Sequence, residues 1–530
     1  MSGVALIRWQ ERSEECVGMA KVTVFDGADC IGGNKIHLDF DGKGLFFDFG
    51  QNYKRMGDYY TDFLKPRSSR GVHDYFEMGL IPDIPQIRAD AMSDDVDHIH
   101  QAKLRVDALF VSHAHMDHIG HAGFLDFSVP FVASPMTAVM MKAMKDCGQR
   151  GCETECVYGQ RRDRDPEDGR IVRTIRMRKG DTYKGRDFML TSTPPEGMRD
   201  FWEESVYSYE IDAGEFLDRS YLDFEFQSFD VDHSIYGATA YAVNTSDGYV
   251  VYTGDLRRHG RFRKRTDDFV EKAADLEPAA LIIEGTRTTR GESVAYVDEA
   301  VVKRTCLDAV KDEGSLVIAD FSARNFERLD TFMEIAQETD RSLVVTKKDA
   351  YYLQAIEKVD GKDRMEGVKV FGALKAQESG VEEAACRCSS EVLDPRSVAE
   401  APERYILCFS YFDMGNLLDI KHKGGTYVYS NSEAFNEEQV VDFRRLSNWL
   451  RLFQLKVKGF TLAGEEGREE PVFDRRFHAS GHVSLDDLID IAREIGAKKV
   501  FPVHTEDPSP LRKAGITGLQ DVRQGKPMQI

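Results

Sequence analysis

The segment VSHAHMDHIGHAG, residues 111–123, constrains the fold of this chain more than any other stretch. It begins at the end of VDALFVS, an apolar run that predicts a buried strand. His113 and His115 follow in an extended turn, and Asp117 with His118 stands where a helix can begin. An extended turn lets alternate side chains meet at one point, and the next turn can serve a second point. Imidazole and carboxylate groups are zinc-type ligands, so the pattern predicts two adjacent metal ions.

Three further ligand candidates stand where other predicted strands end. FDVDH leads to His233, GYVVYTGD leads to Asp255, and AKKVFPVH leads to His504. Strand ends are a common place for sites on layered scaffolds, so we expect these side chains to join the first motif. Other histidines lack such a setting, and we expect surface positions or local hydrogen bonds for His37, His73, His98, His100 and His259.

The predicted secondary structure changes along the 530 residues of the chain, a length that suits two or more domains. Its N-terminal part is mostly predicted strand and turn. Residues 236–254 predict a hairpin with its turn at 246–248. From about 295 to 450, helix and strand patterns alternate, which indicates a parallel α/β unit. Near the C-terminus, Ser484 with Asp487 predicts a capped helix start.

The composition is that of a globular protein, with 42% hydrophobic and 10% aromatic residues. No apolar run approaches the roughly 18–20 residues of a membrane helix. The N-terminus carries charges where a signal peptide needs an apolar stretch, so the sequence predicts a soluble, cytoplasmic protein with no membrane partner.

The nine cysteines are odd in number and scattered, which favours reduced thiols over a disulfide framework. The one cluster lacks the fourth ligand of a structural zinc site, and the charged run QRRDRDPEDGR follows it. A charged surface loop is therefore the favoured interpretation of Cys147, Cys152 and Cys156.

The formal net charge is −21, which on average argues against a nucleic-acid-binding protein. A local basic patch can still bind phosphates. Directly after Asp255 the chain reads LRRHGRFRKR, the most basic stretch of the sequence. Two interpretations stay open: a solvated loop that balances nearby acids, or a phosphate-binding patch at the mouth of the site. The second predicts substrate contacts from Arg261, Arg263 and Arg265.

These motifs resemble those of the metallo-β-lactamase superfamily. Its four motifs correspond here to Asp48 in FDFG, to the 113–118 segment, to His233 and to Asp255. The resemblance implies that Asp255 bridges two zinc ions, and that Asp48 is not a ligand but braces the second motif. It also implies an αββα sandwich, built from both ends of the chain.

The resemblance further implies how the ligands divide between the two ions. One zinc is bound by the residues that match His113, His115 and His233. The other is bound by those that match Asp117 and His118, together with a further histidine.

An extra α/β unit between Asp255 and the last histidine resembles the β-CASP nucleases, such as ribonuclease J and the endonuclease of mRNA 3′-end processing. Their additional motifs match Glu284 (motif A), His482 (motif B) and His504 (motif C). Motif C is typically valine in the DNA-repair branch, so a histidine favours RNA. Further substrate contacts implied by the resemblance are Ser322 and Asn325 in IADFSARNFERL, and His478 and Ser480 in HASGHVS.

The implied fold is α/β, a metallo-β-lactamase αββα sandwich with an inserted α/β β-CASP domain. We expect the first part of the metallo-β-lactamase domain at 1–294, the β-CASP domain at 295–451 and the closing part at 452–530. Residues 147–230 form a charged insertion. The segment GTYVYSNSEAFNEEQVVDFRRLSNWL looks closer to archaeal and related β-CASP proteins than to the classical bacterial enzyme.

The implied function is a zinc-dependent ribonuclease that hydrolyses single-stranded RNA, as a 5′→3′ exonuclease, an endonuclease or both. Asp117, Glu284 and His482 are the predicted catalytic residues, with His482 as the acid that Glu284 orients. Two alternatives stay open: an RNA-binding subunit that does not cut, and a metal-dependent hydrolase of a small ester or thioester. Whether the chain forms a homo-oligomer is open as well.

Overall fold

The computed structural model describes residues 19–61, 64–96, 104–148, 151–288, 297–322, 324–387, 391–431, 437–464 and 469–530. Side chains of residues 437–441 are outside this description. In the described part of the chain no helix is long and apolar enough to cross a membrane.

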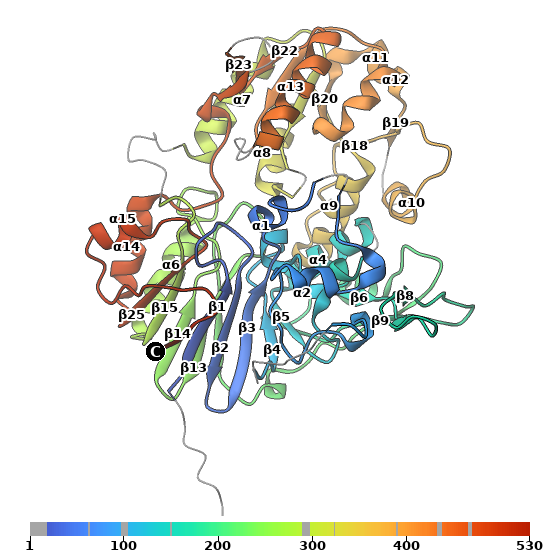
Figure 1. Ribbon diagram of the computed structural model, residues 1–530. Helices are drawn as coiled ribbons and strands as arrows, with labels where there is room; N and C mark the ends of the chain where they lie inside the picture. Colours follow the sequence, from blue (N-terminus) through green and yellow to red (C-terminus); the bar gives the residue numbers. More distant parts are fainter. Residues whose placement is uncertain are drawn as a thin grey trace, which may run out of the picture.

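Two β-sheets face each other in the lower part of the molecule (Figure 1). The first is mixed, with the strand order β10 (Phe188–Leu190), β5 (Phe131–Ala133), β4 (Ala108–Phe110), β3 (Lys43–Phe49), β2 (Lys35–Phe40), β1 (Lys21–Asp26) and β26 (Pro527–Gln529). The second has the order β12 (Phe226–Asp230), β13 (Thr239–Thr245), β14 (Gly248–Tyr252), β15 (Ala280–Glu284) and β25 (Lys499–Val503). Strands β25 and β26 come from the C-terminus, so both ends of the chain build this domain.

Apolar side chains hold the two sheets together. Phe47 and Phe110 of the first sheet pack against Tyr252 and Tyr241 of the second, with ring centroids 4.9 and 5.1 Å apart. A fully buried side chain of this size contributes roughly 1.5–3 kcal/mol to folding, so the facing layers are strongly stabilised.

Helices cover the outer faces of both sheets. The first sheet is covered by α4 (Pro135–Cys147), and the second by α6 (Arg263–Asp275) and α14 (Leu485–Ile495). The predicted αββα sandwich is confirmed.

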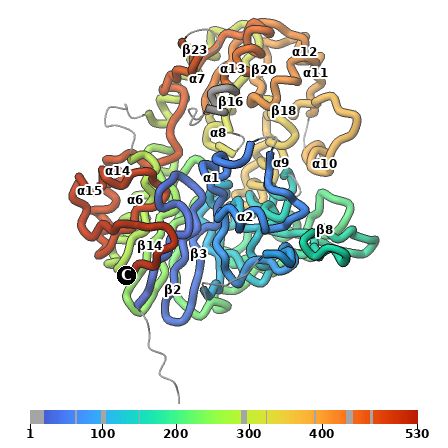
Figure 2. The backbone as a smooth tube through the Cα atoms, viewed as in Figure 1, coloured from blue at the N-terminus to red at the C-terminus, as the bar shows by residue number. Residues whose placement is uncertain are grey.

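The inserted unit lies above the two sheets (Figure 2). Its sheet is entirely parallel, with the order β19 (Val392–Leu393), β18 (Val368–Phe371), β17 (Ser342–Val345), β20 (Tyr405–Cys408), β16 (Val317–Asp320), β21 (Thr426–Tyr429) and β22 (Lys456–Lys458). Its helices are α7 (Glu299–Lys311), α8 (Phe326–Glu338), α9 (Lys347–Asp360), α10 (Gly380–Arg387), α11 (Pro395–Glu400), α12 (Leu417–Ile420) and α13 (Glu437–Leu452). The predicted parallel α/β unit is confirmed.

The predicted end of this unit at residue 451 is too early. Strand β22 follows that position and pairs with β21, and the hairpin of β23 (Phe460–Ala463) and β24 (Glu470–Phe473) packs against α13 through Phe443 and Phe473. The inserted domain therefore includes about twenty more residues. The predicted boundary at 294/295 lies outside the described residues.

Two local predictions are confirmed. Strands β13 and β14 form the expected antiparallel hairpin, in which Thr245 pairs with Gly248. The Ser484 side chain accepts a hydrogen bond from the Asp487 backbone N–H and caps α14.

The surface-loop interpretation of the cysteine cluster is wrong for two of its members. Cys152 and Cys156 are buried in the core beside α4, and only Cys147 is half-buried. The segment that follows folds into β6 (Tyr158–Gly159), β7 (Arg162–Arg164), β8 (Val172–Thr174), β9 (Tyr183–Gly185), α5 (Met198–Glu203) and β11 (Ile211–Asp212).

Candidate metal centre and active site

Four strands bring predicted ligands to one edge of the sandwich. His113 lies three residues after β4, His233 three after β12, Asp255 three after β14, and His504 directly after β25. The short helix α3 (Met116–Ile119) begins after His115 and carries the remaining two ligands of the opening motif, Asp117 and His118. The convergence follows from the topology, because β14, β15 and β25 are parallel neighbours whose carboxyl ends meet.

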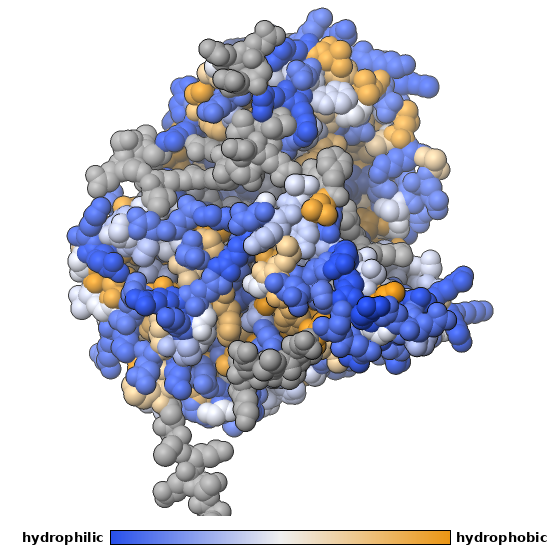
Figure 3. All heavy atoms as spheres, in the orientation of Figure 1, coloured by the Kyte–Doolittle hydropathy of each residue, from blue (hydrophilic) through white to orange (hydrophobic). Residues whose placement is uncertain are grey.

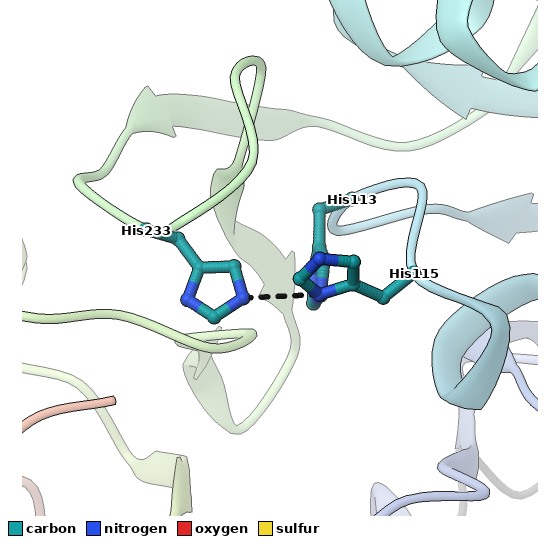
Figure 4. A group of neighbouring side chains, drawn as sticks. All are labelled: His113, His115 and His233. Carbon is teal, nitrogen blue, oxygen red and sulfur yellow. Dashed lines mark hydrogen bonds between the residues drawn. The ribbon is translucent and has the colours of Figure 1, made fainter. Parts of the chain in front are cut away.

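A triad of histidines forms the first group of donors (Figure 4). His115 Nδ1 is 3.0 Å from His113 Nε2 and 3.2 Å from His233 Nε2. The three nitrogens therefore face a single point, and His113, His115 and His233 together form a group able to hold a metal ion.

Asp117, His118 and His504 form the second group. His504 Nε2 is 3.5 Å from Asp117 Oδ2, and His118 Nε2 is 3.9 Å from the same oxygen. The buried Nε2 of His504 has no hydrogen-bond partner, which leaves its lone pair available to a cation.

Asp255 lies between the two groups. Its Oδ2 is 3.1 Å from His118 Nε2 and 3.8 Å from His113 Nε2, while Oδ1 is 2.8 Å from His504 Nδ1. Asp255 therefore contacts side chains of both groups.

Hydrogen bonds to the protein fix which nitrogen each ring presents. His233 donates from Nδ1 to the Gly481 carbonyl at 2.6 Å, and His118 donates from Nδ1 to Asp48 at 2.7 Å. Burial lowers the pKa of His113, His115 and His233 well below the usual value, so these rings are neutral and can act as ligands. The donor set therefore fits a pair of zinc-type ions.

Asp48 has the bracing position that its motif implies. It accepts hydrogen bonds from the Ser112 backbone and hydroxyl, both at 2.7 Å, from His118 Nδ1, and from the Tyr252 hydroxyl at 2.6 Å. Its backbone has φ of 56°, a conformation that non-glycine residues rarely adopt. Four donors on one buried carboxylate hold the 112–118 turn in place.

Glu284 and His482 form a pair beside the bridging aspartate. Glu284 Oε2 is 3.1 Å from His482 Nδ1, and Oε1 accepts the Leu256 backbone N–H at 2.8 Å. Burial alone would lower the pKa of His482, but the carboxylates of Glu284 and Asp255 outweigh it and raise the pKa to about 9. The ring is therefore protonated at neutral pH, as a general acid must be.

Four of the seven residues predicted to contact substrate have different environments. Ser322 lines a cleft between the two domains. Asn325 uses its side-chain oxygen to cap α8, so the structure gives it a local role. His478 lies beside Arg328 and Glu299, away from the metal ligands, and burial lowers its pKa to about 3. The Ser480 hydroxyl accepts the His482 backbone N–H at 3.2 Å.

The basic run after Asp255 does not form a free cationic patch at the mouth of the site. Arg261 forms an ion pair with Glu334 at 2.8 Å and donates to Thr331, both on α8. Arg263 begins α6 and pairs with Asp267 at 3.2 Å, and Arg265 packs over the Phe262 ring. None of these three arginines lines the interdomain cleft. The run is a helix start, not a loop, but Arg261 and Arg263 balance nearby acids as the first interpretation expects. Contact of these arginines with a phosphate backbone stays a prediction.

The cleft between the domains has a volume of about 1330 Å³ and reaches the metal motif at Met116. Sequence reasoning missed one of its cations, Arg324, which lies within IADFSARNFERL. Arg324 is close enough to His115 and to the Tyr53 hydroxyl to act electrostatically on both. No carboxylate in the described ranges pairs with it. The sequence signal that could have identified Arg324 was its position two residues after Ser322, behind a predicted strand.

The histidines expected to have local roles divide as follows. His37 contacts the Arg105 carbonyl at 2.8 Å, His73 contacts Asp74, and His259 contacts the Ser480 carbonyl. His98 and His100 lie outside the described residues. His121, from the opening motif, is buried against the Tyr75 ring and belongs to neither ligand group.

Comparisons with known proteins agree with this geometry. No protein-family model matches the chain. A ribonuclease J from Pyrococcus abyssi is 24% identical over 516 residues, which cover 94% of this chain and 91% of that protein. The chain is therefore similar to a ribonuclease J over nearly the whole length of both proteins.

One solved structure shares the fold of this chain. A protein of unknown function from Enterococcus faecalis V583 superposes with a TM-score of 0.64 at 19% identity, covering 97% of this chain and all of the other. The metallo-β-lactamase fold protein YhfI from Bacillus subtilis covers 55% of this chain and 79% of its own at 15% identity, with a TM-score of 0.24 that is too low to bear on the fold.

Proposed function

We propose that this protein is a zinc-dependent ribonuclease that hydrolyses phosphodiester bonds of single-stranded RNA. The observation that carries the proposal is the meeting of seven ligand-type side chains with the Glu284–His482 pair. The 24% identity to a ribonuclease J supports RNA as the substrate class. We place this activity in RNA processing or decay in the cytoplasm.

The residues would hold two Zn²⁺ ions, one at His113, His115 and His233, and one at Asp117, His118 and His504, with Asp255 between them. When bound, the metal pair lowers the pKa of a water molecule and stabilises negative charge on phosphate oxygens. The protein keeps the imidazoles neutral by burial and fixes their orientation through Asp48 and the Gly481 carbonyl.

His482 supplies the proton for the leaving 3′-oxygen. Its Nδ1 is held by Glu284, which leaves Nε2 for the substrate. The carboxylates of Glu284 and Asp255 raise the pKa of His482 to about 9, which favours the protonated ring. In-line hydrolysis then leaves a 5′-phosphate on the downstream product.

The complete ligand set argues against an RNA-binding subunit that does not cut. The large interdomain cleft, which carries Arg324 and Ser322, argues against a small ester as the substrate. Cleavage of labelled RNA by the purified protein, with and without a chelator, tests the proposal. A 5′-monophosphorylated linear RNA and a circular RNA, compared as substrates, separate the two modes: cleavage of the linear RNA alone identifies an exonuclease.

A further inference from the structure

Arg257, two residues after the bridging Asp255, is fully buried at the centre of a charged cluster. Its guanidinium forms ion pairs with Asp232 at 3.2 Å, with Glu299 at 3.4 Å and with Glu327. Arg328 pairs with Glu299 at 3.1 Å. All five side chains are at most 5% exposed, and together we call them the Arg257 cluster.

The cluster joins three parts of the molecule. Asp232 immediately precedes the ligand His233 in the catalytic domain. Glu299 begins α7, and Glu327 lies in the first turn of α8, both in the inserted domain. The same guanidinium donates from Nη1 to the Ser480 carbonyl at 3.3 Å, in the segment that leads to His482.

The backbone carbonyls of the 477–481 segment are held from several sides. The Phe477 carbonyl accepts from Arg328 at 3.2 Å, and the Ser480 carbonyl accepts from His259 at 2.8 Å as well as from Arg257. The Gly481 carbonyl accepts from the ligand His233. This segment has no helix or strand of its own beyond Phe477, so these bonds set the position of His482.

A guanidinium suits this task because its donors lie in one plane and in fixed directions. Arg257 uses that plane to contact both domains and the 477–482 segment at once. A lysine would keep the charge but has no rigid fork to reach all of these acceptors. Misplacement of a catalytic group by about 1 Å can cost roughly 10²-fold in rate.

We propose that Arg257 is a positioning residue that aligns His482 with the leaving oxygen and makes this alignment depend on the seating of helices α7 and α8 of the inserted domain. The inference rests on the proposed function. In the step concerned, the P–O3′ bond breaks as the bond from phosphorus to the oxygen of an attacking hydroxide forms. The proton moves from His482 to O3′, which keeps the electron pair of the broken bond.

The inference predicts a dependence on the leaving group. The 3′-oxygen of RNA is a strongly basic leaving group and needs the proton. The p-nitrophenolate of bis(p-nitrophenyl) phosphate is stable without it. Loss of His482 alignment should therefore slow RNA cleavage and leave hydrolysis of the activated diester almost unchanged, whereas general damage to the fold or the metal centre should slow both.

The test compares Arg257→Lys and Glu299→Gln with wild type and with His482→Ala, on both substrates. Arg258→Met is the matched control, because Arg258 pairs with Glu494 and Asp267 and contacts no carbonyl of the 477–482 segment. We expect Arg257→Lys to lower kcat on RNA by about 10²-fold with zinc content retained. Glu299→Gln should have a smaller effect of the same kind, and Arg258→Met none.

Adding Arg257→Lys to His482→Ala should cause no further loss on RNA, because both changes remove the same proton transfer. Equal losses on both substrates, or loss of zinc, in Arg257→Lys and Glu299→Gln would overturn the inference and leave a structural role only. RNA cleavage at the wild-type rate by both variants would also overturn it. Failure of the wild-type protein to cut RNA would instead refute the proposed function.

Discussion

The metal centre and the Arg257 cluster are neighbours in the chain and both are buried, yet they differ in which groups they bring together. In the cluster, each buried charge has partners of opposite sign. In the metal centre, imidazole nitrogens face each other at 3.0–3.2 Å, and among the described residues His504 Nε2 has no hydrogen-bond partner but lies 3.5 Å from Asp117 Oδ2. Imidazole nitrogens that face one another beside carboxylates form a metal-type donor set, so this region is the one suited to hold cations.

The net charge of the protein does not indicate how its basic residues are used. The face in Figure 3 is mostly hydrophilic, and the protein carries a net charge of −21. The most basic stretch of the sequence is used inside the molecule and at a helix start, not as an open patch. We therefore expect an RNA strand to contact cations in the cleft, where Arg324 lies.

The largest expected effect is loss of the metal centre. His115→Ala removes Nδ1 of His115, the nitrogen that lies close to both His113 and His233. The change should abolish hydrolysis and lower the zinc content. His121→Phe, in the same motif but packed against Tyr75, should keep both. Elemental analysis measures the zinc content, and an RNA cleavage assay measures hydrolysis. Full zinc content in the His115 variant would contradict the assignment.

The second effect concerns the acid. His482→Ala should lower the rate of RNA cleavage by roughly 10²–10⁴-fold, the range for a lost general acid, with both zinc ions retained. Because His482, Glu284 and Asp255 also form a group able to hold a metal, the zinc content decides between the roles. A variant that loses one zinc would show that His482 is a ligand.

The third effect concerns Asp48, which holds the 112–118 turn in place. Asp48→Asn keeps the size of the side chain but loses the charge that four donors share. Zinc affinity should fall by about 10–100-fold, as for other residues that orient metal ligands. Competition with a chelator measures the affinity. An unchanged value would mean that Asp48 only stabilises the fold.

The smallest effect should come from the basic run. Replacement of Arg261, Arg263 and Arg265 by Ala should barely change RNA affinity, because Arg261 is bound to α8 and none of the three lines the cleft. Arg324→Ala should instead reduce the slope of affinity against salt by up to about 0.7, the value for one lost single-strand phosphate contact. The reverse ranking would restore the patch interpretation and place the RNA path over α6.

That the ligand candidates lie together could be predicted from the sequence because each follows an apolar strand, and the strand pattern alone indicates where its end lies. The Arg257 cluster could not, since its partners are 25 to 70 residues from Arg257 along the chain and meet only through the packing of two domains. The domain boundary predicted at 451 was too early for the same reason, because β22 is a short, largely exposed strand that only its pairing with β21 identifies. Burial of Cys152 and Cys156 likewise depends on their packing beside α4.

The central claim is that a pair of zinc ions, held by these side chains, makes the protein a ribonuclease. The most direct measurement is RNA cleavage by metal-free protein as zinc is added in steps. The account predicts no cleavage without metal and full activity at two equivalents per chain, with none regained by the His115→Ala variant. RNA cleavage at the full rate by protein shown to contain no transition metal would contradict it.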